Sequence, residues 1–289
     1  MAPKKEMLGK LFKYGDKGVQ VAFRSGNFSK QAIFIGGLTD GLLATKYVEP
    51  LAHALGAIQW SLVQPLFSSS YTGYGVSSLD QDAQEIESLI KFLVNEEGSE
   101  GVVLIGHSTG CQDIVHYLRV GGVCTRAVRG VILQGPVSDR EYLATMPDTA
   151  KHLQLAEKMI AEGKKHALMP REASPEAPIT AYRYHSLASP GGDDDMFSSD
   201  LPQQTLEWKL GHMALIPTAI IFSMQDEFVP PHVDKAALLK RLSKAMGGAE
   251  AIAVQGGDHS LSNRTADAVH SIIEFIRKEG PKGWDDPWT

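Results

Sequence analysis

The sequence predicts an α/β fold, in which a mostly parallel sheet is covered by helices on both faces. Short, nearly all-apolar segments alternate with longer segments in which apolar residues recur every three or four positions. A parallel strand buried on both faces has a continuous apolar sequence, whereas a covering helix needs only one apolar face. The length of 289 residues and the 43% hydrophobic content allow one large domain.

The first two strands are expected at residues 19–23 and 32–35, where β-branched and aromatic residues are frequent. The second is followed by two glycines. A helical pattern then covers residues 46–55, and a strand is expected at 57–63. Pro65 should stop this strand, because proline has no N–H to donate to a sheet.

Ser78 and Gln81 resemble a capping box, which predicts that a helix begins there and ends before Gly98. Its apolar residues have helical spacing. They are Ala83, Ile86, Leu89, Ile90 and Leu93. The later elements are expected as strands at 102–105, 131–133, 218–222 and 251–254, separated by helices around 114–118, 236–246 and 266–276.

Residues 136–215 interrupt this alternation. They contain one helical pattern at 149–162, then several prolines and an acidic run at 193–195. Segments of this length without structure of their own are uncommon inside compact domains. We therefore expect residues 1–135 and 216–289 to form the core, with residues 136–215 inserted as a lid.

The motif G-H-S-T-G at residues 106–110 lies between the apolar run 102–105 and a helical pattern. This context is typical of a nucleophile elbow, in which a sharp turn between strand and helix exposes a serine, here Ser108. Glycines flank the turn because a side chain there would clash with the neighbouring strand and helix. Five residues alone are weak evidence, so the rest of the sequence has to supply the partners.

A serine hydroxyl needs an adjacent base, which a carboxylate orients. Asp226 follows the strand expected to end at Phe222, and His259 follows the strand expected to end at Val254. The order serine, acid, histidine, each after the end of a strand, is that of the α/β-hydrolase fold. The sequence thus predicts Ser108 as nucleophile, His259 as general base and then acid, and Asp226 as the orienting carboxylate.

Three other carboxylates are candidates for the acid. Asp139 follows the strand that ends at Leu133 and occupies the other position where hydrolases place this group, so it stays an alternative. Asp226 is preferred because it stands closer to its strand. Glu227 is expected to point elsewhere, and Asp258 is too near His259 in sequence to orient it.

The backbone N–H groups of Thr109 and Leu38 are expected to form the oxyanion hole, since one follows the nucleophile and the other follows an early strand. Gly37, His107 and Tyr71 are further candidates for substrate contact. His107 adjoins the nucleophile. Tyr71 follows the end of a strand, where a plain turn is an equally good interpretation.

Composition excludes several other functions. The net charge of −6 gives no signature of nucleic-acid binding. No apolar stretch approaches the roughly 18 residues of a membrane span, and the first residues do not resemble a signal peptide, so a cytoplasmic location is expected. Cys111 and Cys124 suit a reducing compartment, with Cys111 as a packing residue. The sequence does not indicate an oligomeric state.

No metal or cofactor is predicted. The run Asp193–Asp195 with Asp200 has no histidine and is interpreted as a solvated turn rather than a cation site. The glycine-rich segment 36–41 follows a strand but lacks the G-x-G-x-x-G spacing of a dinucleotide site. Ester hydrolysis by a serine requires no cofactor.

Four segments carry a resemblance to a known family. They are residues 34–41, 69–75, 106–113 and 191–200. Together they make the chain, from about Gly9 to Ile276, similar to the fungal siderophore-esterase group of α/β-hydrolases, long labelled as a domain of unknown function. The resemblance places the family nucleophile, acid and histidine at Ser108, Asp226 and His259.

The resemblance implies an intracellular serine esterase that cuts ester bonds of fusarinine-type hydroxamate siderophores, so that imported iron can be released. The expected partner is thus a small-molecule ester. Two alternatives stay open. One is an esterase or lipase-like hydrolase with another acyl substrate, and the other is a catalytically idle binding protein on the same scaffold.

Overall fold

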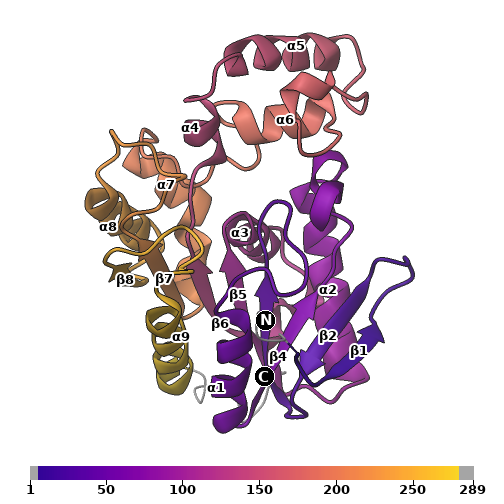
Figure 1. The fold of residues 1–289 in the computed structure, drawn as a ribbon, viewed down its shortest axis with the longest axis vertical. Coiled ribbons are helices and arrows are strands. Elements are labelled where there is room, and N and C mark those ends of the chain that lie inside the picture. The colour runs from indigo at the N-terminus through magenta and orange to yellow at the C-terminus, as the bar shows by residue number, and fades with distance from the viewer. Residues whose placement is uncertain (1–5, 280–289) are drawn as a thin grey trace, which may run out of the picture.

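The computed structural model describes residues 6–279, and a single twisted sheet runs through their centre (Figure 1). Its strands are β1 Lys10–Lys13, β2 Val21–Ser25, β3 Lys30–Ile35, β4 Trp60–Pro65, β5 Gly101–His107, β6 Val128–Gln134, β7 Thr218–Ser223 and β8 Glu250–Val254. Their order is β1-β2-β4-β3-β5-β6-β7-β8. Only β1 with β2 and β2 with β4 pair antiparallel. The predicted α/β fold with a mostly parallel sheet is confirmed.

Helices cover both faces of this sheet. They are α1 Val48–Ala57, α2 Leu79–Asn95, α3 Gly110–Val120, α4 Asp139–Leu143, α5 Thr149–Ala161, α6 Ala181–Ala188, α7 Gln203–Leu210, α8 Lys235–Ala245 and α9 Thr265–Glu279. Helices α1 and α9 pack on one face, and α2, α3 and α8 on the other. Figure 1 shows α5 and α6 beyond the carboxyl ends of the central strands. No helix among the described residues combines the length and apolar character needed to cross a membrane.

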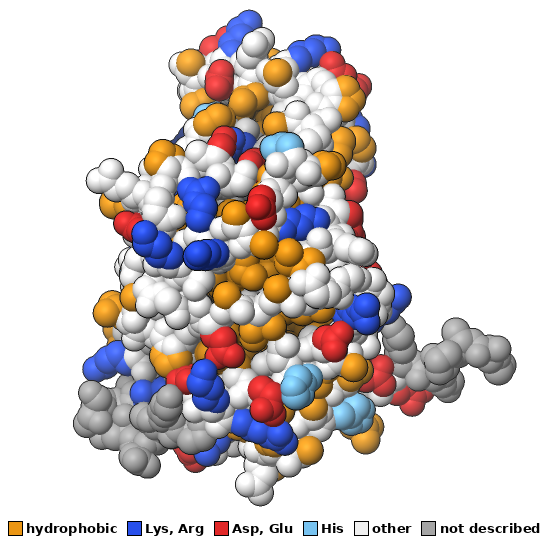
Figure 2. Space-filling model, turned by 90° about the vertical axis from the view of Figure 1, so that its left-hand side faces the viewer, with side chains coloured by type: hydrophobic (Ala, Val, Ile, Leu, Met, Phe, Trp, Pro, Cys, Tyr) orange, Lys and Arg blue, Asp and Glu red, His pale blue; other side chains and the backbone are white. Residues whose placement is uncertain are grey.

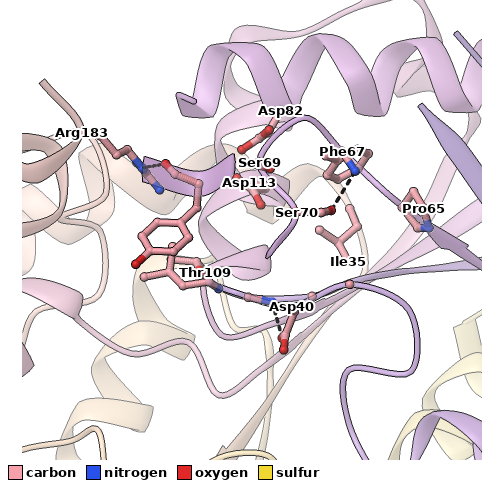
Figure 3. Close-up of a pocket in the computed structure, with 15 residues that line it drawn as sticks. Ile35, Asp40, Pro65, Phe67, Ser69, Ser70, Asp82, Thr109, Asp113 and Arg183 are labelled. Atoms are coloured by element: carbon pink, nitrogen blue, oxygen red, sulfur yellow. Dashed lines mark hydrogen bonds between the residues drawn. The ribbon is translucent and has the colours of Figure 1, made fainter. Parts of the chain in front are cut away.

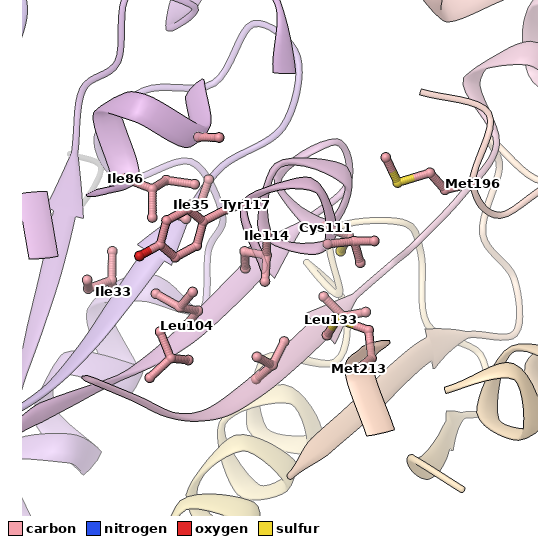
Figure 4. Packing of buried hydrophobic residues seen from close by; sticks show 14 of the residues in the cluster. Ile33, Ile35, Ile86, Leu104, Cys111, Ile114, Tyr117, Leu133, Met196 and Met213 are labelled. Atoms are coloured by element: carbon pink, nitrogen blue, oxygen red, sulfur yellow. The ribbon is translucent and has the colours of Figure 1, made fainter. Parts of the chain in front are cut away.

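The two faces of the sheet belong to two separate apolar clusters, because successive side chains of a strand point to opposite sides. Ile33 and Ile35 of β3 pack towards α2 and α3, whereas Ala32 and Phe34 pack towards α1 and α9. Figure 4 shows Ile33 and Ile35 with Leu104, beneath α3. Each fully buried aliphatic side chain contributes about 1.5–3 kcal/mol, so this packing fixes the ends of the strands that carry the site.

The structure agrees with most expected elements and corrects some of their limits. The capping box forms, since Ser78 Oγ accepts from the N–H of Gln81 at 3.2 Å. Strand β1 was not expected, because Phe12 is its only buried residue. Helix α1 continues through Ala57, so β4 begins only at Trp60 and extends as far as Pro65.

The sheet has a second edge at β8, where Ala251 and Ala253 are exposed and Val254 is buried. Figure 2 views the molecule from this side and shows hydrophobic side chains gathered at mid-height. The apolar sequence of β8 alone would indicate a strand buried on both faces. In the structure β8 is instead an edge strand.

Residues 136–215 contain four α-helices, so the expectation of a single helix was wrong. Helices α4, α6 and α7 have five to eight residues, which is too short to show helical periodicity. Helices α5 and α6 pack with Tyr74 in an apolar cluster of their own. Leu206, Leu210 and Met213 instead join the cluster beneath α3 and α8. The division at residues 135 and 215 stays a prediction.

Candidate active site

Ser108 lies in a strained turn between β5 and α3. Its φ of 53° is in the left-handed region, which side chains adopt at a cost of about 1–3 kcal/mol. A Cβ at Gly106 would lie 2.7 Å from the carbonyl oxygen of Gly110, and a Cβ at Gly110 would lie 2.3 Å from that of Ile35. The N–H of Ser108 donates to the carbonyl of Gln134 at 3.0 Å. The turn therefore forms only with glycine at both flanking positions.

The structure brings Ser108, His259 and Asp226 together in one hydrogen-bonded chain. Ser108 Oγ lies 2.9 Å from His259 Nε2, and His259 Nδ1 lies 2.7 Å from Asp226 Oδ2. These residues follow β5, β8 and β7, whose carboxyl ends meet at one edge of the sheet. The carboxylate fixes the proton of His259 on Nδ1, which leaves Nε2 free to accept the serine proton.

Asp226 is itself held in place. Its side chain is buried, and its second oxygen accepts from the N–H of Phe228 at 2.9 Å. Lys235 Nζ donates to the carbonyl of Asp226 at 2.8 Å. Glu227 points elsewhere, as expected, but it accepts from the backbone N–H of His259 at 2.8 Å. The two neighbouring acids thus bind the side chain and the backbone of the same histidine.

Asp139, the alternative acid, contacts a different partner. Its carboxylate accepts from Gln112 Nε2 at 3.1 Å, while the Nδ1 of His259 faces Asp226. Burial raises the pKa of Asp139 to about 7, so the ionised form is disfavoured there. The geometry therefore favours Asp226 as the partner of the histidine.

The loop after β3 passes directly beside Ser108, since a Cβ at Gly37 would contact the serine side chain. The N–H of Leu38 donates to Thr109 Oγ1 at 2.7 Å, and the N–H of Gly37 donates to Asp40 Oδ2 at 2.7 Å. Both amides are thus engaged within the protein, and the side chain of Thr109 joins this loop to the elbow. The expected oxyanion hole at Leu38 and Thr109 stays a prediction.

Gly37 leaves no room for a side chain beside Ser108. A Cβ at this position would lie 2.6 Å from Ser108 Cβ and 3.1 Å from its Oγ. We expect Gly37→Ala to displace Ser108 and lower kcat at least about a hundredfold, because a displacement of about 1 Å can cost that much. Steady-state ester hydrolysis with circular dichroism measures this. A folded variant with the kcat of the wild type would contradict it.

The two other candidates for substrate contact differ in exposure. His107 is buried, and its Nδ1 lies 2.7 Å from Gln134 Oε1. Tyr71 is 50% exposed, and its ring packs on Gly41 in the loop after β3. Tyr71 therefore borders the loop that lies beside Ser108. Substrate contact by either residue stays a prediction.

Phe228 and Gln134 contact His259, and the sequence indicated neither contact. The ring of Phe228 stacks edge-on against the imidazole, with 4.7 Å between centroids, and Tyr142 of α4 packs on Phe228 at 4.8 Å. The side chain of Gln134 donates to the carbonyl of His259 at 2.8 Å. No local pattern could reveal these contacts, since they join residues far apart in the chain.

Asp193 and Asp200 are exposed, but the interpretation of the acidic run after α6 as a solvated turn was wrong for Asp194 and Asp195. Asp194 and Asp195 are both buried. Asp194 Oδ2 lies 2.5 Å from Arg183 Nη1, and Asp195 Oδ1 lies 3.0 Å from Arg140 Nε. These carboxylates are the counter-ions of two arginines. Among residues 6–279, no three His, Cys, Asp or Glu side chains are grouped to hold a metal ion.

A polar cavity of about 30 Å³ lies beside the loop after β3 (Figure 3). Figure 3 shows Asp82 of α2, Asp113 of α3 and Arg183 of α6 around it. Burial raises the pKa of Asp82 to about 7 and that of Asp113 well above its ordinary value. The rest of the lining comes from the loop after β3, from the segment after β4 and from Tyr74 and Thr109. Three of the four segments that carried the family resemblance, 34–41, 69–75 and 106–113, therefore meet at this cavity, and the fourth contacts it through the ion pair of Asp194 with Arg183.

Comparison with known proteins gives relatives for nearly the whole chain. A family described as "Protein of unknown function (DUF1749)" matches residues 1–278. The fusarinine C esterase sidJ of Aspergillus fumigatus is 31% identical over 292 residues, which covers 80% of this chain and 82% of the relative. An esterase of Emericella nidulans is 30% identical over 322 residues, covering 90% and 86%.

A solved structure agrees with these relatives. The siderophore hydrolase EstB from Aspergillus fumigatus has a TM-score of 0.75 and 28% identity to this chain, with 96% of this chain and 98% of that chain covered. The topology, the geometry at Ser108 and these relatives point to the same class of enzyme. The chain belongs to the DUF1749 family, has the α/β-hydrolase fold, and is a carboxylic ester hydrolase.

Proposed function

We propose that the chain is a serine esterase in which Ser108 is the nucleophile, His259 the general base and acid, and Asp226 the orienting carboxylate. The observation that carries this proposal is the continuous chain of contacts, 2.9 Å from Ser108 Oγ to His259 Nε2 and 2.7 Å from His259 Nδ1 to Asp226 Oδ2. Both distances are those of good hydrogen bonds, so no rearrangement is needed before proton transfer.

In the first half of the reaction, Ser108 Oγ bonds to the ester carbonyl carbon and its proton moves to His259 Nε2. The bond from that carbon to the leaving alcohol oxygen then breaks, and His259 returns the proton to the alcohol. In the second half, water attacks the acyl-serine ester and gives its proton to His259. The carboxylic acid leaves, and the proton returns to Ser108 Oγ.

The N–H groups of Thr109 and Leu38 would stabilise the negative oxygen of each tetrahedral intermediate. In the structure the Leu38 N–H donates to Thr109 Oγ1, which lies one residue after the nucleophile. A bound ester oxygen would therefore compete with the threonine hydroxyl for this amide. The hydroxyl would hold the loop in place until substrate arrives.

The proposed substrates are fusarinine-type hydroxamate siderophores, in which ester bonds join the hydroxamate units. The names of two relatives support this substrate class, since one is a fusarinine C esterase and the other a siderophore hydrolase. Three of the four resemblance segments, 34–41, 69–75 and 106–113, contribute residues to the cavity beside Thr109, which also supports this substrate class. Iron would enter the site as cargo of the substrate.

We expect the purified protein to hydrolyse fusarinine C or its triacetyl derivative to linear fragments. Each compound, iron-loaded and iron-free, should be incubated with the protein and analysed by mass spectrometry, with Ser108→Ala as the matched control. Failure to cut either compound, with rapid cleavage of short p-nitrophenyl esters, would replace the siderophore by another acyl substrate. Fragments that also form with Ser108→Ala would not come from this site.

We also propose that residues 136–215 act as a lid. Tyr142 of α4 packs on Phe228, and Phe228 packs on His259, so this segment reaches the proposed general base through two aromatic contacts. Arg183 of α6 donates through Nε to the carbonyl of Tyr74 at 3.2 Å, which joins the segment to the core on the other side.

A cytoplasmic location, expected from the sequence, stays a prediction.

A further inference from the structure

Gln134 is a buried side chain at the end of β6 that joins the two histidines of the site. Its Nε2 donates to the carbonyl oxygen of His259 at 2.8 Å. Its Oε1 lies 2.7 Å from His107 Nδ1 and 2.9 Å from the hydroxyl of Tyr47. Gln134 is fully buried, so water cannot replace these partners. The proposed mechanism gives this residue no role.

The backbone fixes the orientation of this amide and, through it, the tautomer of His107. The carbonyl of His259 can only accept, so the nitrogen of Gln134 must face it and the oxygen must face His107. Because that oxygen can only accept, Nδ1 of His107 must carry a hydrogen. If His107 is neutral, its Nε2 then carries none.

The other groups around His107 set its charge. His259 lies with its ring centroid 5.0 Å away, and Asp40 Oδ2 lies 4.0 Å from His107 Nε2. Tyr47 faces the same glutamine oxygen. Burial, followed by the repulsive charge of His259, lowers the pKa of His107 to about 3, against an opposing effect of the bond to Gln134. His107 is therefore neutral at ordinary pH, although a carboxylate lies nearby.

We propose that Gln134 is a positioning residue with two tasks: it anchors the loop of His259, and it fixes His107 as the neutral Nδ1–H tautomer. During the proposed reaction His259 becomes positively charged each time it holds the serine proton. A second charged imidazole beside it would oppose that step. Burial thus leaves the positive charge to His259, and Gln134 determines which nitrogen of the neutral His107 carries the hydrogen. This inference deepens the proposed function and rests on it for the role of His259.

The tautomer can be measured on the unaltered protein. In a sample with ¹⁵N-labelled histidine, we expect His107 to show a protonated Nδ1 and a bare Nε2, with no titration between about pH 5 and 9. The signal of His107 is assigned by its loss in His107→Asn. A protonated Nε2, or titration of His107 in that range, would overturn the proposal whether or not the protein hydrolyses esters.

The anchoring task is tested by Gln134→Glu. The carboxylate can still accept from His107 and Tyr47 but cannot donate to the carbonyl of His259 when ionised. We expect kcat on p-nitrophenyl acetate to fall at least about tenfold with KM nearly unchanged, because positioning acts in the transition state. The carboxylate also favours a charged His107, so the acid limb of the pH profile should move to higher pH.

Gln31→Glu is the matched control. Gln31 is equally buried, on β3, and neither polar atom of its side chain has a hydrogen-bond partner among the described residues. Both variants bury a carboxylate, so Gln31→Glu should lose thermal stability as Gln134→Glu does. It should nevertheless keep the kcat and pH profile of the wild type. A Gln134→Glu protein that behaves like Gln31→Glu would overturn the anchoring role. An inactive wild-type protein would instead count against the proposed function, and the tautomer measurement would still decide the inference.

Discussion

Ser108→Ala is expected to lower kcat for ester hydrolysis by about 10⁵ to 10⁶, because loss of the nucleophile removes the covalent pathway. The variant should also fail to react with a fluorophosphonate probe, which labels activated serines. The 2.9 Å contact between Ser108 Oγ and His259 Nε2 is the basis for both expectations. Labelling followed by mass spectrometry of the modified peptide identifies the reacting residue directly.

Ser223→Ala provides a matched control for this experiment. Ser223 is buried at the end of β7, and its Oγ has no hydrogen-bond partner among the described residues. Its loss should leave both labelling and kcat close to the wild-type values. Equal labelling of Ser108→Ala and the wild type would remove Ser108 as the nucleophile and, with it, the proposed mechanism.

Asp226→Asn is expected to lower kcat by about 10⁴, as removal of the orienting carboxylate does in serine proteases. The asparagine amide can donate to Nδ1 of His259, which would place the imidazole proton on Nε2. That nitrogen could then no longer accept the proton of Ser108. The rate constant should be measured across the pH range, with circular dichroism to establish that the variant is folded.

Asp139→Asn tests the alternative acid in the same assay. Asp139 contacts Gln112 rather than His259 Nδ1, so the kcat of the Asp139→Asn variant should stay within about tenfold of the wild-type value. Asparagine keeps an oxygen that can accept from Gln112. A loss for Asp139→Asn that equals or exceeds the loss for Asp226→Asn would transfer the role of the acid to Asp139.

The sequence was sufficient for the order of the central strands and for the residues that follow β5, β7 and β8. Apolar runs and helical spacing are local properties, so they indicated the central strands and α2 with its cap at Ser78. The glycines required on both sides of Ser108 could likewise be recognised in the local sequence. Short elements such as β1 and α6 could not be recognised in the sequence, because four to eight residues with few apolar positions show no periodicity.

Only the tertiary structure decided which side chains meet. The contact between Ser108 and His259 spans 151 residues and the contact between Gln134 and His259 spans 125, so both depend on the order of strands in the sheet. The same holds for the buried partners of Asp194 and for the different contacts of Asp226 and Asp139. Sequence by itself determined where each reactive group enters the fold, because strand ends are fixed locally. The distances between them were decided by packing, since burial and long-range contact exist only once the chain has folded.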